Sequence, residues 1–297
     1  MDTAISVNNL IKKYNNYPAL KGISFNVTEG ETFALLGGNG AGKTTTLECI
    51  EGFRKFDSGE IEIFGLPTND SNIRKITGVQ LQSTSLPDNV TSIEVLKLFS
   101  KWNNTTVNLE LFDTFGLKDL YSKQYKTMST GQKRRLHLAL ALTNNPKIIF
   151  LDEPTAGLDI EGRISLHEEI KKLKKQGKTI IIASHDMSEV ESLCDRVAII
   201  KDGIIAFIGT PYELALSYNS NTKIHIKSKN EVYKKDFSSC EYNCIDKGYS
   251  VYSTKNISDG LIEILDYMKK SNNVIIDIKI EHPSLEESFM EIAKGEK

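Results

Sequence analysis

Short apolar runs alternate along most of the chain with stretches that place apolar residues three or four positions apart. The runs are typical of buried strands and the wider spacing is typical of helices packed on a core. Because strands alternate with helices, we expect a largely parallel sheet covered by helices. The expected strands lie at residues 4–10, 20–27, 32–36, 60–64, 147–151, 179–184, 197–201 and 204–209, and the expected helices at 43–53, 129–144, 161–176 and 187–194, with short helices near 93–99 and 109–115.

The pattern changes near residue 218, where residues 218–222 form a polar break rich in turn-forming residues. Beyond the break, Ser284 and Glu287 form a capping-box pattern that opens a last helix. We therefore predict two domains, residues 1–218 and residues 219–297, the second a small α+β domain. Its other expected elements are strands at 223–226, 249–252 and 274–280 and a helix at 257–268.

Composition and charge narrow the possible partners. Lys and Arg number 37 against 39 Asp and Glu, a net charge of -2, so no overall positive field exists to attract nucleic acid, and we expect no nucleic-acid partner. The apolar runs are far shorter than the ~20 residues of a membrane helix, and the first ten residues lack the features of a secretory signal. We therefore expect a cytoplasmic protein. Cys49 and Cys194 fit core positions, while Cys240 and Cys244 are too few for a structural zinc site.

The segment from Gly37 to Thr44 fits the phosphate-loop pattern Gly-x-x-x-x-Gly-Lys-Ser/Thr, between an expected strand and an expected helix. Such a loop holds a polyphosphate with backbone N–H groups at the positive end of a helix dipole. Lys43 would reach the outer phosphates, and Thr44 would offer a hydroxyl to Mg²⁺. The expected nucleotide-binding residues of this segment are Gly37, Gly38, Asn39, Gly40, Ala41, Gly42, Lys43, Thr44 and Thr45.

Two adjacent carboxylates, Asp152 and Glu153, follow the apolar strand at residues 147–151. Ligands of open α/β sheets bind beyond the carboxyl ends of the strands. In phosphoryl transfer, one carboxylate can order the Mg²⁺ ligands while a second polarises the attacking water. Together with the phosphate loop, the pair indicates a site for phosphoryl transfer from a nucleotide.

Six motifs, in order within residues 1–215, resemble the ATP-binding subunits of ABC transporters. Besides the phosphate loop, the resemblance is carried by residues 128–136, 152–159 and 184–186. It implies an α/β fold, a P-loop NTPase of ABC type with a mixed-sheet core, an antiparallel β subdomain and a helical subdomain. It also implies an ATPase with ATP and Mg²⁺ as cofactors.

The resemblance implies roles for residues on the nucleotide side of the site. Glu153 is the catalytic base, with Lys43 and His185 on the γ-phosphate. Thr44, Gln82 and Asp152 are the implied Mg²⁺ ligands, and Gln82 also lies near the attacking water. Gln80 is an alternative to Gln82, which the four-residue spacing from Gly78 favours.

The resemblance also implies which residues contact the adenine and which contact the nucleotide of a second subunit. By the resemblance, Tyr14 stacks on adenine, with Tyr17 as the alternative. Ser129, Gly131 and Gln132 contact the nucleotide of a second subunit, and Asp159 is the carboxylate of the loop that follows Glu153. The sequence departs from the family pattern at two positions: Gly38 stands in place of a proline, and Thr130 stands in place of a glycine.

The same resemblance implies an assembly. Two ATPase subunits, identical or paralogous, face each other head to tail. A separate transmembrane permease docks on the surface between Gln82 and Met128, so that the chain lies peripherally on the inner face of the cell membrane. Residues 282–289 resemble the tail of ATPases that serve ABC-2-type exporters of drugs, peptides or lipids. An importer ATPase and a soluble ABC ATPase without a transport role are the alternatives.

Overall fold

The computed structural model describes residues 2–15, 17–81, 85–216, 222–230, 236–282 and 284–294. The chain divides into two compact units, Met1–Pro211 and Tyr212–Lys297. The domain boundary predicted at residue 218 lies outside the described residues. In the part of the chain that is described, no helix is long and apolar enough to cross a membrane.

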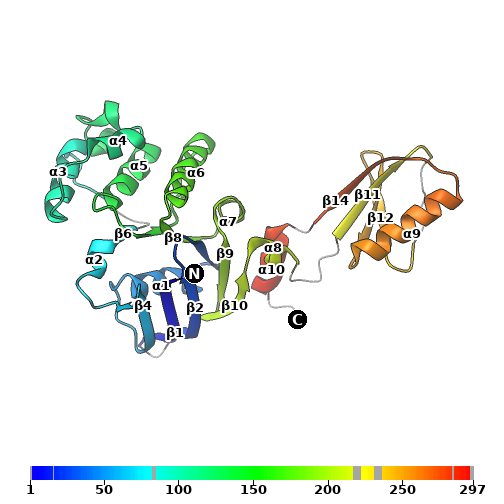
Figure 1. Ribbon diagram of the computed structural model, residues 1–297, viewed down its shortest axis with the longest axis horizontal. Helices are drawn as coiled ribbons and strands as arrows, with labels where there is room; N and C mark the ends of the chain where they lie inside the picture. The colour runs from blue at the N-terminus through cyan, green and yellow to red at the C-terminus, as the bar shows by residue number, and fades with distance from the viewer. Residues whose placement is uncertain are drawn as a thin grey trace. The chain divides into compact units, whose positions relative to one another are not determined.

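A six-stranded mixed sheet forms the centre of the first unit (Figure 1). Five of its strands are parallel and β10 runs antiparallel to β9. Every residue of β3, β7 and β8 is buried, as their continuous apolar sequences predict. The strand order is β10 (Ile204–Gly209), β9 (Arg196–Lys201), β3 (Thr32–Leu36), β8 (Thr179–Ser184), β7 (Ile148–Asp152) and β6 (Thr77–Gln80).

A second, antiparallel sheet packs with α1 (Lys43–Ile50) around the main core of this unit. Leu47 and Cys49 of α1 and Phe33 and Phe150 of the central sheet are all fully or almost fully buried there. Cys49 therefore has the core position that its sequence context predicts. The strands, in order, are β2 (Tyr17–Thr28), β1 (Thr3–Tyr14), β4 (Ser58–Ile63) and β5 (Leu66–Pro67).

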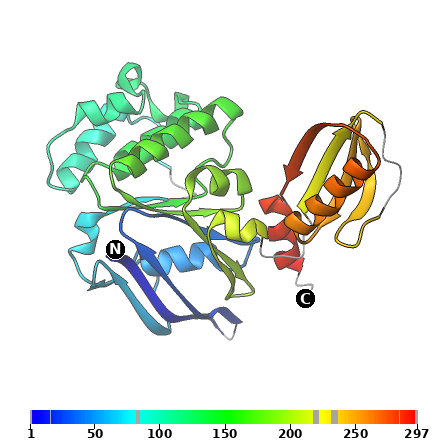
Figure 2. The ribbon, with the colours of Figure 1, turned by 45° about the vertical axis from the view of Figure 1, so that its right-hand side comes forward.

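Helices cover the opposite face of the central sheet from α1 (Figures 1 and 2). They are α3 (Ser92–Trp102), α4 (Leu109–Thr114), α5 (Thr130–Ala141) and α6 (Ile160–Lys175), with the 3-10 turns η1 (Lys118–Leu120) and η2 (Tyr125–Thr127). Helix α7 (Met187–Leu193) follows β8, and the short α2 (Ile73–Ile76) precedes β6. The mixed-sheet core, antiparallel sheet and helical group agree with the predicted fold class. Neither β6 nor α2 is predicted, because each has only four residues.

The second unit is an antiparallel sheet with a helix on one face. Ile264 and Met268 of α9 (Ile257–Lys270) pack against Ile224 and Tyr252 of the sheet. Cys240 is buried in this core and Cys244 is exposed. The strand order is β12 (Glu241–Asp246), β13 (Tyr249–Thr254), β11 (Thr222–Ser228) and β14 (Ile275–Glu281).

Two short helices complete the second unit. The hydroxyl of Ser288 in α10 (Leu285–Lys294) donates a hydrogen bond to the carbonyl of Ala215 in α8 (Pro211–Leu216), at 3.3 Å. The capping box is confirmed at the start of α10, because the Ser284 and Glu287 side chains each accept a hydrogen bond from the other's backbone N–H. Helix α8 and strand β12 are not predicted, since neither has a marked apolar period.

Candidate active site

The predicted phosphate loop lies between β3 and α1, and close backbone approaches explain its glycines. A Cβ atom on Gly37 would lie 2.4 Å from the carbonyl oxygen of Ile200, and one on Gly42 would lie 2.7 Å from the Leu20 side chain. Gly42, the N-cap of α1, also has φ +114°, a conformation that favours glycine. The packing of the loop therefore requires glycine at these two positions. Glycine also has no side chain that could cover the backbone N–H groups of the loop.

Lys43 is held inside this loop. Its Nζ donates to the carbonyl oxygens of Gly37, at 2.7 Å, and Gly38, at 3.3 Å, and the residue is only 6% exposed. Burial lowers the pKa of Lys43, while the charges of Glu153 and Asp152 act in the opposite direction. Lys43 and Glu153 also line the same pocket.

A pocket of about 340 Å³ opens above the loop, and we call it the phosphate-loop pocket. Both candidate aromatic residues, Tyr14 and Tyr17, line it. The Tyr14 hydroxyl lies 3.4 Å from the Thr45 hydroxyl, and the guanidinium of Arg54 lies 5.2 Å from the ring centre. Its full lining is Tyr14, Tyr17, Ala19, Gly38, Asn39, Gly40, Ala41, Gly42, Lys43, Thr44, Thr45 and Glu153.

The residues present at the end of β7 fit a divalent cation. Asp152 is 5% exposed, and its Oδ2 accepts a hydrogen bond from the Thr44 hydroxyl at 3.4 Å. Its Oδ1 is buried without a hydrogen-bond partner among the described residues. Burial and the neighbouring Glu153 raise the pKa of Asp152. A hard cation such as Mg²⁺ binds carboxylate and hydroxyl oxygens, and its charge would satisfy the orphaned oxygen.

Of the two glutamines considered from the sequence, Gln82 lies outside the described residues. Gln80 ends β6 and pairs with Leu151 in the neighbouring strand. Its side chain is buried, and neither its amide nitrogen nor its amide oxygen has a hydrogen-bond partner in the described part of the chain.

Glu153 and His185 meet at the edge of the sheet. The Nδ1 atom of His185 lies 3.1 Å from Oε1 of Glu153, and the backbone N–H of Glu153 donates to the carbonyl of Ala183 at 2.9 Å. Glu153 has φ +47°, which is uncommon for a residue with a side chain and costs about 1 kcal/mol or more. This turn directs a carboxylate, whose side chain is 13% exposed, toward the more exposed imidazole.

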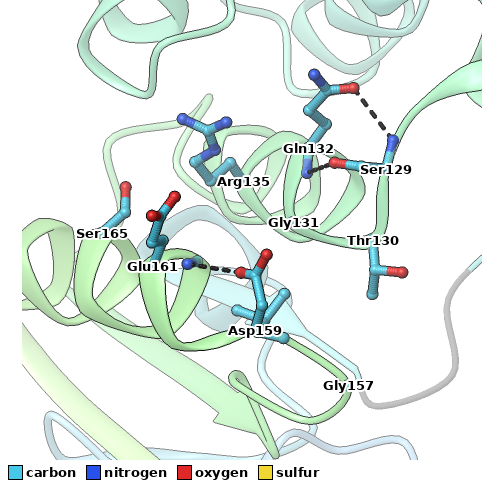
Figure 3. Close-up of a pocket in the computed structure, with 11 residues that line it drawn as sticks. Ser129, Thr130, Gly131, Gln132, Arg135, Gly157, Asp159, Glu161 and Ser165 are labelled. Atoms are coloured by element: carbon cyan, nitrogen blue, oxygen red, sulfur yellow. Dashed lines mark hydrogen bonds between the residues drawn. The ribbon is translucent and has the colours of Figure 1, made fainter.

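A second pocket, of about 510 Å³, lies between the N-terminal ends of α5 and α6 (Figure 3), and we call it the α5/α6 pocket. Ser129 caps α5, because its hydroxyl accepts from the Gln132 N–H at 3.2 Å while the Gln132 side chain accepts from the Ser129 N–H at 3.1 Å. Asp159 caps α6 by accepting from the Gly162 N–H at 2.8 Å. Two helix N-termini facing one hollow favour an anionic ligand.

The sequence analysis missed three polar residues of the α5/α6 pocket, Arg135, Glu161 and Ser165. Arg135 lies one helical turn beyond Gln132, so the helical period is the signal that would have indicated it. Ser165 lies one turn beyond Glu161, which was itself not predicted as a site residue. Thr130, which stands in place of a glycine, is exposed and lines the pocket.

The structure therefore divides the predicted site residues into two groups. The phosphate loop, Asp152, Glu153 and His185 come together at the carboxyl ends of β3, β7 and β8. Ser129, Gly131, Gln132 and Asp159 line the other pocket, and no residue lines both. Each pocket alone holds only part of the predicted nucleotide contacts.

Comparisons with known proteins agree on one family. A family model described as ABC transporter matches residues 20–156. The chain is 35% identical to an uncharacterized ABC transporter ATP-binding protein of Nostoc sp., over 92% of this chain and 82% of that relative. It is 35% identical to the linearmycin resistance ATP-binding protein LnrL of Bacillus subtilis, over 75% of this chain and 74% of LnrL. It is 37% identical to the Nod factor export ATP-binding protein I of Burkholderia orbicola, over 71% and 72% of the two chains.

A solved structure extends the likeness to the fold. The ATP-binding cassette MJ0796, solved as a dimer in a post-hydrolysis state with ADP and phosphate, matches with a TM-score of 0.63 and 28% identity. The match covers 69% of this chain and 98% of MJ0796.

Proposed function

Because the chain belongs to the family of ABC transporter ATP-binding proteins, which are ATPases, we propose that it powers export of a drug, peptide or lipid through a separate transmembrane subunit. Two relatives support the direction, since one is named for Nod factor export and another for linearmycin resistance. In this proposal the chain lies on the inner face of the membrane, held there by its permease.

The observation that carries the hydrolytic part of the proposal is the pairing of Glu153 with His185 beside the phosphate loop. Glu153 accepts a proton from the attacking water, and His185 orients the γ-phosphate and the Glu153 carboxylate. Lys43 neutralises charge on the outer phosphates. Thr44 and Asp152 would hold Mg²⁺, which when bound would supply further positive charge to the phosphates.

ABC ATPase subunits dimerise, and the two pockets suggest how this chain does so. We propose that two copies, or a copy and a paralogue, pair head to tail. Ser129 and Gly131 of one subunit then approach the phosphates held by the phosphate loop of the other. This arrangement uses the helix N-termini of the α5/α6 pocket, which shares no lining residue with the phosphate-loop pocket of the same chain.

Glu153→Gln tests the hydrolytic and dimer proposals together. The amide keeps the size of the side chain but cannot accept a proton, so the hydrolysis rate should fall by about 10² to 10⁴. ATP binding should persist, and the closed dimer should accumulate with Mg-ATP, as measured by size-exclusion chromatography with light scattering. Glu168→Gln, at an exposed position of α6, is the matched control.

The outcomes separate the two claims. Near-normal phosphate release by Glu153→Gln would remove this residue from the role of base. A variant that binds ATP without hydrolysis and stays monomeric would contradict the head-to-tail pairing while leaving the role of Glu153 intact.

Purification of the tagged chain from membranes tests the transport direction. Recovery of an exporter-type permease supports the proposal. Recovery of a permease with a substrate-binding protein would instead favour an importer, and recovery of no membrane protein would favour a soluble ABC ATPase.

A further inference from the structure

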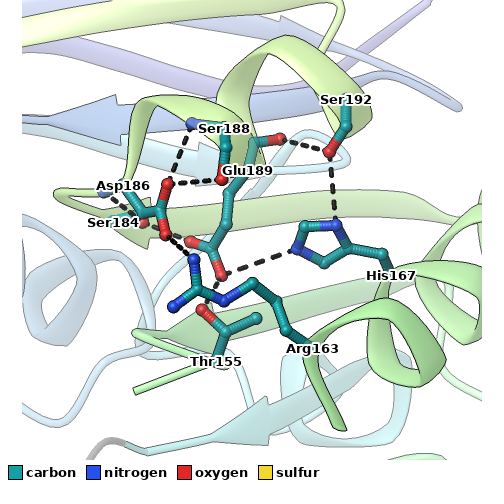
Figure 4. Close-up of polar contacts among 8 residues, drawn as sticks. All are labelled: Thr155, Arg163, His167, Ser184, Asp186, Ser188, Glu189 and Ser192. Atoms are coloured by element: carbon teal, nitrogen blue, oxygen red, sulfur yellow. Dashed lines mark hydrogen bonds and ion pairs between the residues drawn. The ribbon is translucent and has the colours of Figure 1, made fainter. Parts of the chain in front are cut away.

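Glu189 is a buried carboxylate within a cluster of polar side chains (Figure 4). It lies on α7 and is only 1% exposed. One carboxylate oxygen accepts a hydrogen bond from the Thr155 hydroxyl and the other accepts one from the Ser184 hydroxyl. A single side chain thus connects two segments that lie 29 positions apart in the sequence.

The two hydroxyls belong to the turns that carry Glu153 and His185. Ser184 ends β8 and directly precedes His185, while Thr155 follows Glu153 by two positions. The Glu153–His185 contact of 3.1 Å joins the same two turns on the pocket side. Glu189 therefore completes a ring of contacts. Each of the two turns is held once by the Glu153–His185 contact and once by a hydrogen bond to Glu189.

Among the described residues, no cationic side chain donates a hydrogen bond to Glu189, although the charge of Arg163 acts to lower its pKa. Arg163 donates to Asp186 at 2.7 Å, and the Nε2 atom of His167 stands 4.0 Å from the Glu189 carboxylate. Burial lowers the pKa of His167 and raises the pKa of Glu189. The two hydroxyl donors are thus the closest hydrogen-bond partners of the carboxylate (Figure 4).

A purely space-filling role does not require a carboxylate at this position. An apolar side chain of similar volume would avoid the cost of removing a carboxylate from water. What the carboxylate provides is two acceptor atoms in a fixed geometry. Ser184 also accepts from the Asp186 N–H at 3.0 Å, so the same hydroxyl fixes the backbone on both sides of His185.

We propose that Glu189 is a positioning residue for ATP hydrolysis, which holds the turns of Glu153 and His185 together through Thr155 and Ser184. The inference rests on the roles proposed above for Glu153 and His185. Without Glu189, the two turns lose their common anchor and the Glu153–His185 geometry loosens. Nucleotide affinity is retained, because the phosphate loop packs against Ile200 of β9 and Leu20 of β2.

The test compares the full chain with Glu189→Ala, Glu189→Gln, Ser184→Ala and Thr155→Val. For Glu189→Ala we expect kcat to fall about tenfold or more, the effect of losing one to two buried hydrogen bonds, with ATP affinity within about twofold of the parent. Glu189→Gln should restore most of the rate, because an amide can accept from one hydroxyl and donate to the other. The two hydroxyl variants should show smaller losses of the same kind.

Glu191→Ala, at an exposed position of the same helix, is the matched control and should leave kcat unchanged. A double-mutant cycle with His185→Ala adds a readout that a merely structural role would not give. If Glu189 acts through His185, Glu189→Ala should cost little in the His185→Ala background.

Three results would overturn the inference: full hydrolysis by Glu189→Ala, equal loss of kcat and ATP affinity in the Glu189 and hydroxyl variants, or equal defects in the alanine and glutamine variants. If Glu189→Ala does not fold, Ser184→Ala and Thr155→Val carry the same test. Full hydrolysis by Glu153→Gln would show instead that the proposed base is wrong. An inactive Glu153→Gln beside a fully active Glu189→Ala would overturn the positioning role alone.

Discussion

Lys43 shows at the scale of one residue how the site is prepared for its ligand. Lys43 is almost fully buried, yet within the described part of the chain its ammonium group donates only to backbone carbonyls of its own loop. A buried cation is costly unless it is paired. A polyphosphate in the phosphate-loop pocket would provide that pairing, so the free site already carries the charge that its ligand requires.

Lys43→Ala removes this charge, and we expect ATP affinity to fall by about 100-fold or more, the upper range for a charge-assisted hydrogen bond. The fold should persist, because the loop glycines and their packing are unchanged. Isothermal titration calorimetry checks the affinity, and Lys118→Ala, at an exposed position, is the control. Unchanged affinity of Lys43→Ala would contradict the assignment of the phosphate loop.

Glu51 gives the protein a dependence on pH that the sequence does not indicate. It follows α1, and one of its carboxylate oxygens is buried without a hydrogen-bond partner among the described residues. Burial, with smaller contributions from Asp152 and Glu48, raises the pKa of Glu51 from 4.5 to about 8. Between these two values the folded chain keeps a proton that the unfolded chain has released, so the free energy of unfolding falls as the pH rises from 4.5 to 8.

Glu51→Gln removes the titrating group and should flatten this slope. The variant should be more stable than the parent at pH 8, with the difference shrinking toward pH 5. Urea unfolding followed by circular dichroism, in the presence of a chelator, measures the trend. Glu168→Gln, an exposed carboxylate on α6, should leave the parent slope in place, and an unchanged slope in Glu51→Gln would refute the assignment.

At the scale of elements, two helices of the first unit begin with the same device. Thr91 and Glu94 form a capping box at α3, and Ser129 and Gln132 form one at α5. Only the second lines the α5/α6 pocket. Comparing variants of these two capping boxes therefore separates two contributions of a cap. One is its contribution to stability, and the other is its proposed contribution to nucleotide binding across a dimer.

Ser129→Ala and Thr91→Ala should each cost about 1 kcal/mol, a fall in Tm of about 2–4 °C. Only Ser129→Ala should also lower hydrolysis and the Mg-ATP-dependent dimer of the Glu153→Gln chain. Thermal unfolding, an assay of phosphate release and light scattering measure the three effects. Equal hydrolysis by both variants would count against a nucleotide contact by Ser129.

At the scale of the whole molecule, all of the predicted site residues lie in the first compact unit. The hydrogen bond from Ser288 to Ala215 ties α8 to α10, so a cut at residue 218 would separate α8 from a partner helix. Leu214 of α8 is fully buried in the intact chain, and we expect it to become partly exposed to solvent after such a cut.

We therefore expect a chain of residues 1–211 to fold and bind ATP. A chain of residues 1–218 should bind ATP as well but aggregate more readily, because it exposes the apolar side of α8. Circular dichroism, calorimetry and light scattering compare the two. An unfolded 1–211 chain would contradict the independence of the first unit.

The sequence by itself determined the parts of the site that depend on local chemistry. The glycine pattern with Lys43 and Thr44 and the carboxylates after an apolar strand can each be recognised within a few residues. The buried strands β3, β7 and β8 were predictable for a similar reason, because a strand covered on both faces is apolar throughout.

Tertiary structure decided the rest, because it depends on contacts between segments distant in sequence. Strand β6 is stabilised by pairing with β7, and the φ of +47° at Glu153 persists because neighbouring strands hold the turn. The buried position of Glu189 likewise depends on hydroxyls from two other elements. No local pattern encodes these contacts, since the free energy that maintains them arises only when the sheet and its helices have packed.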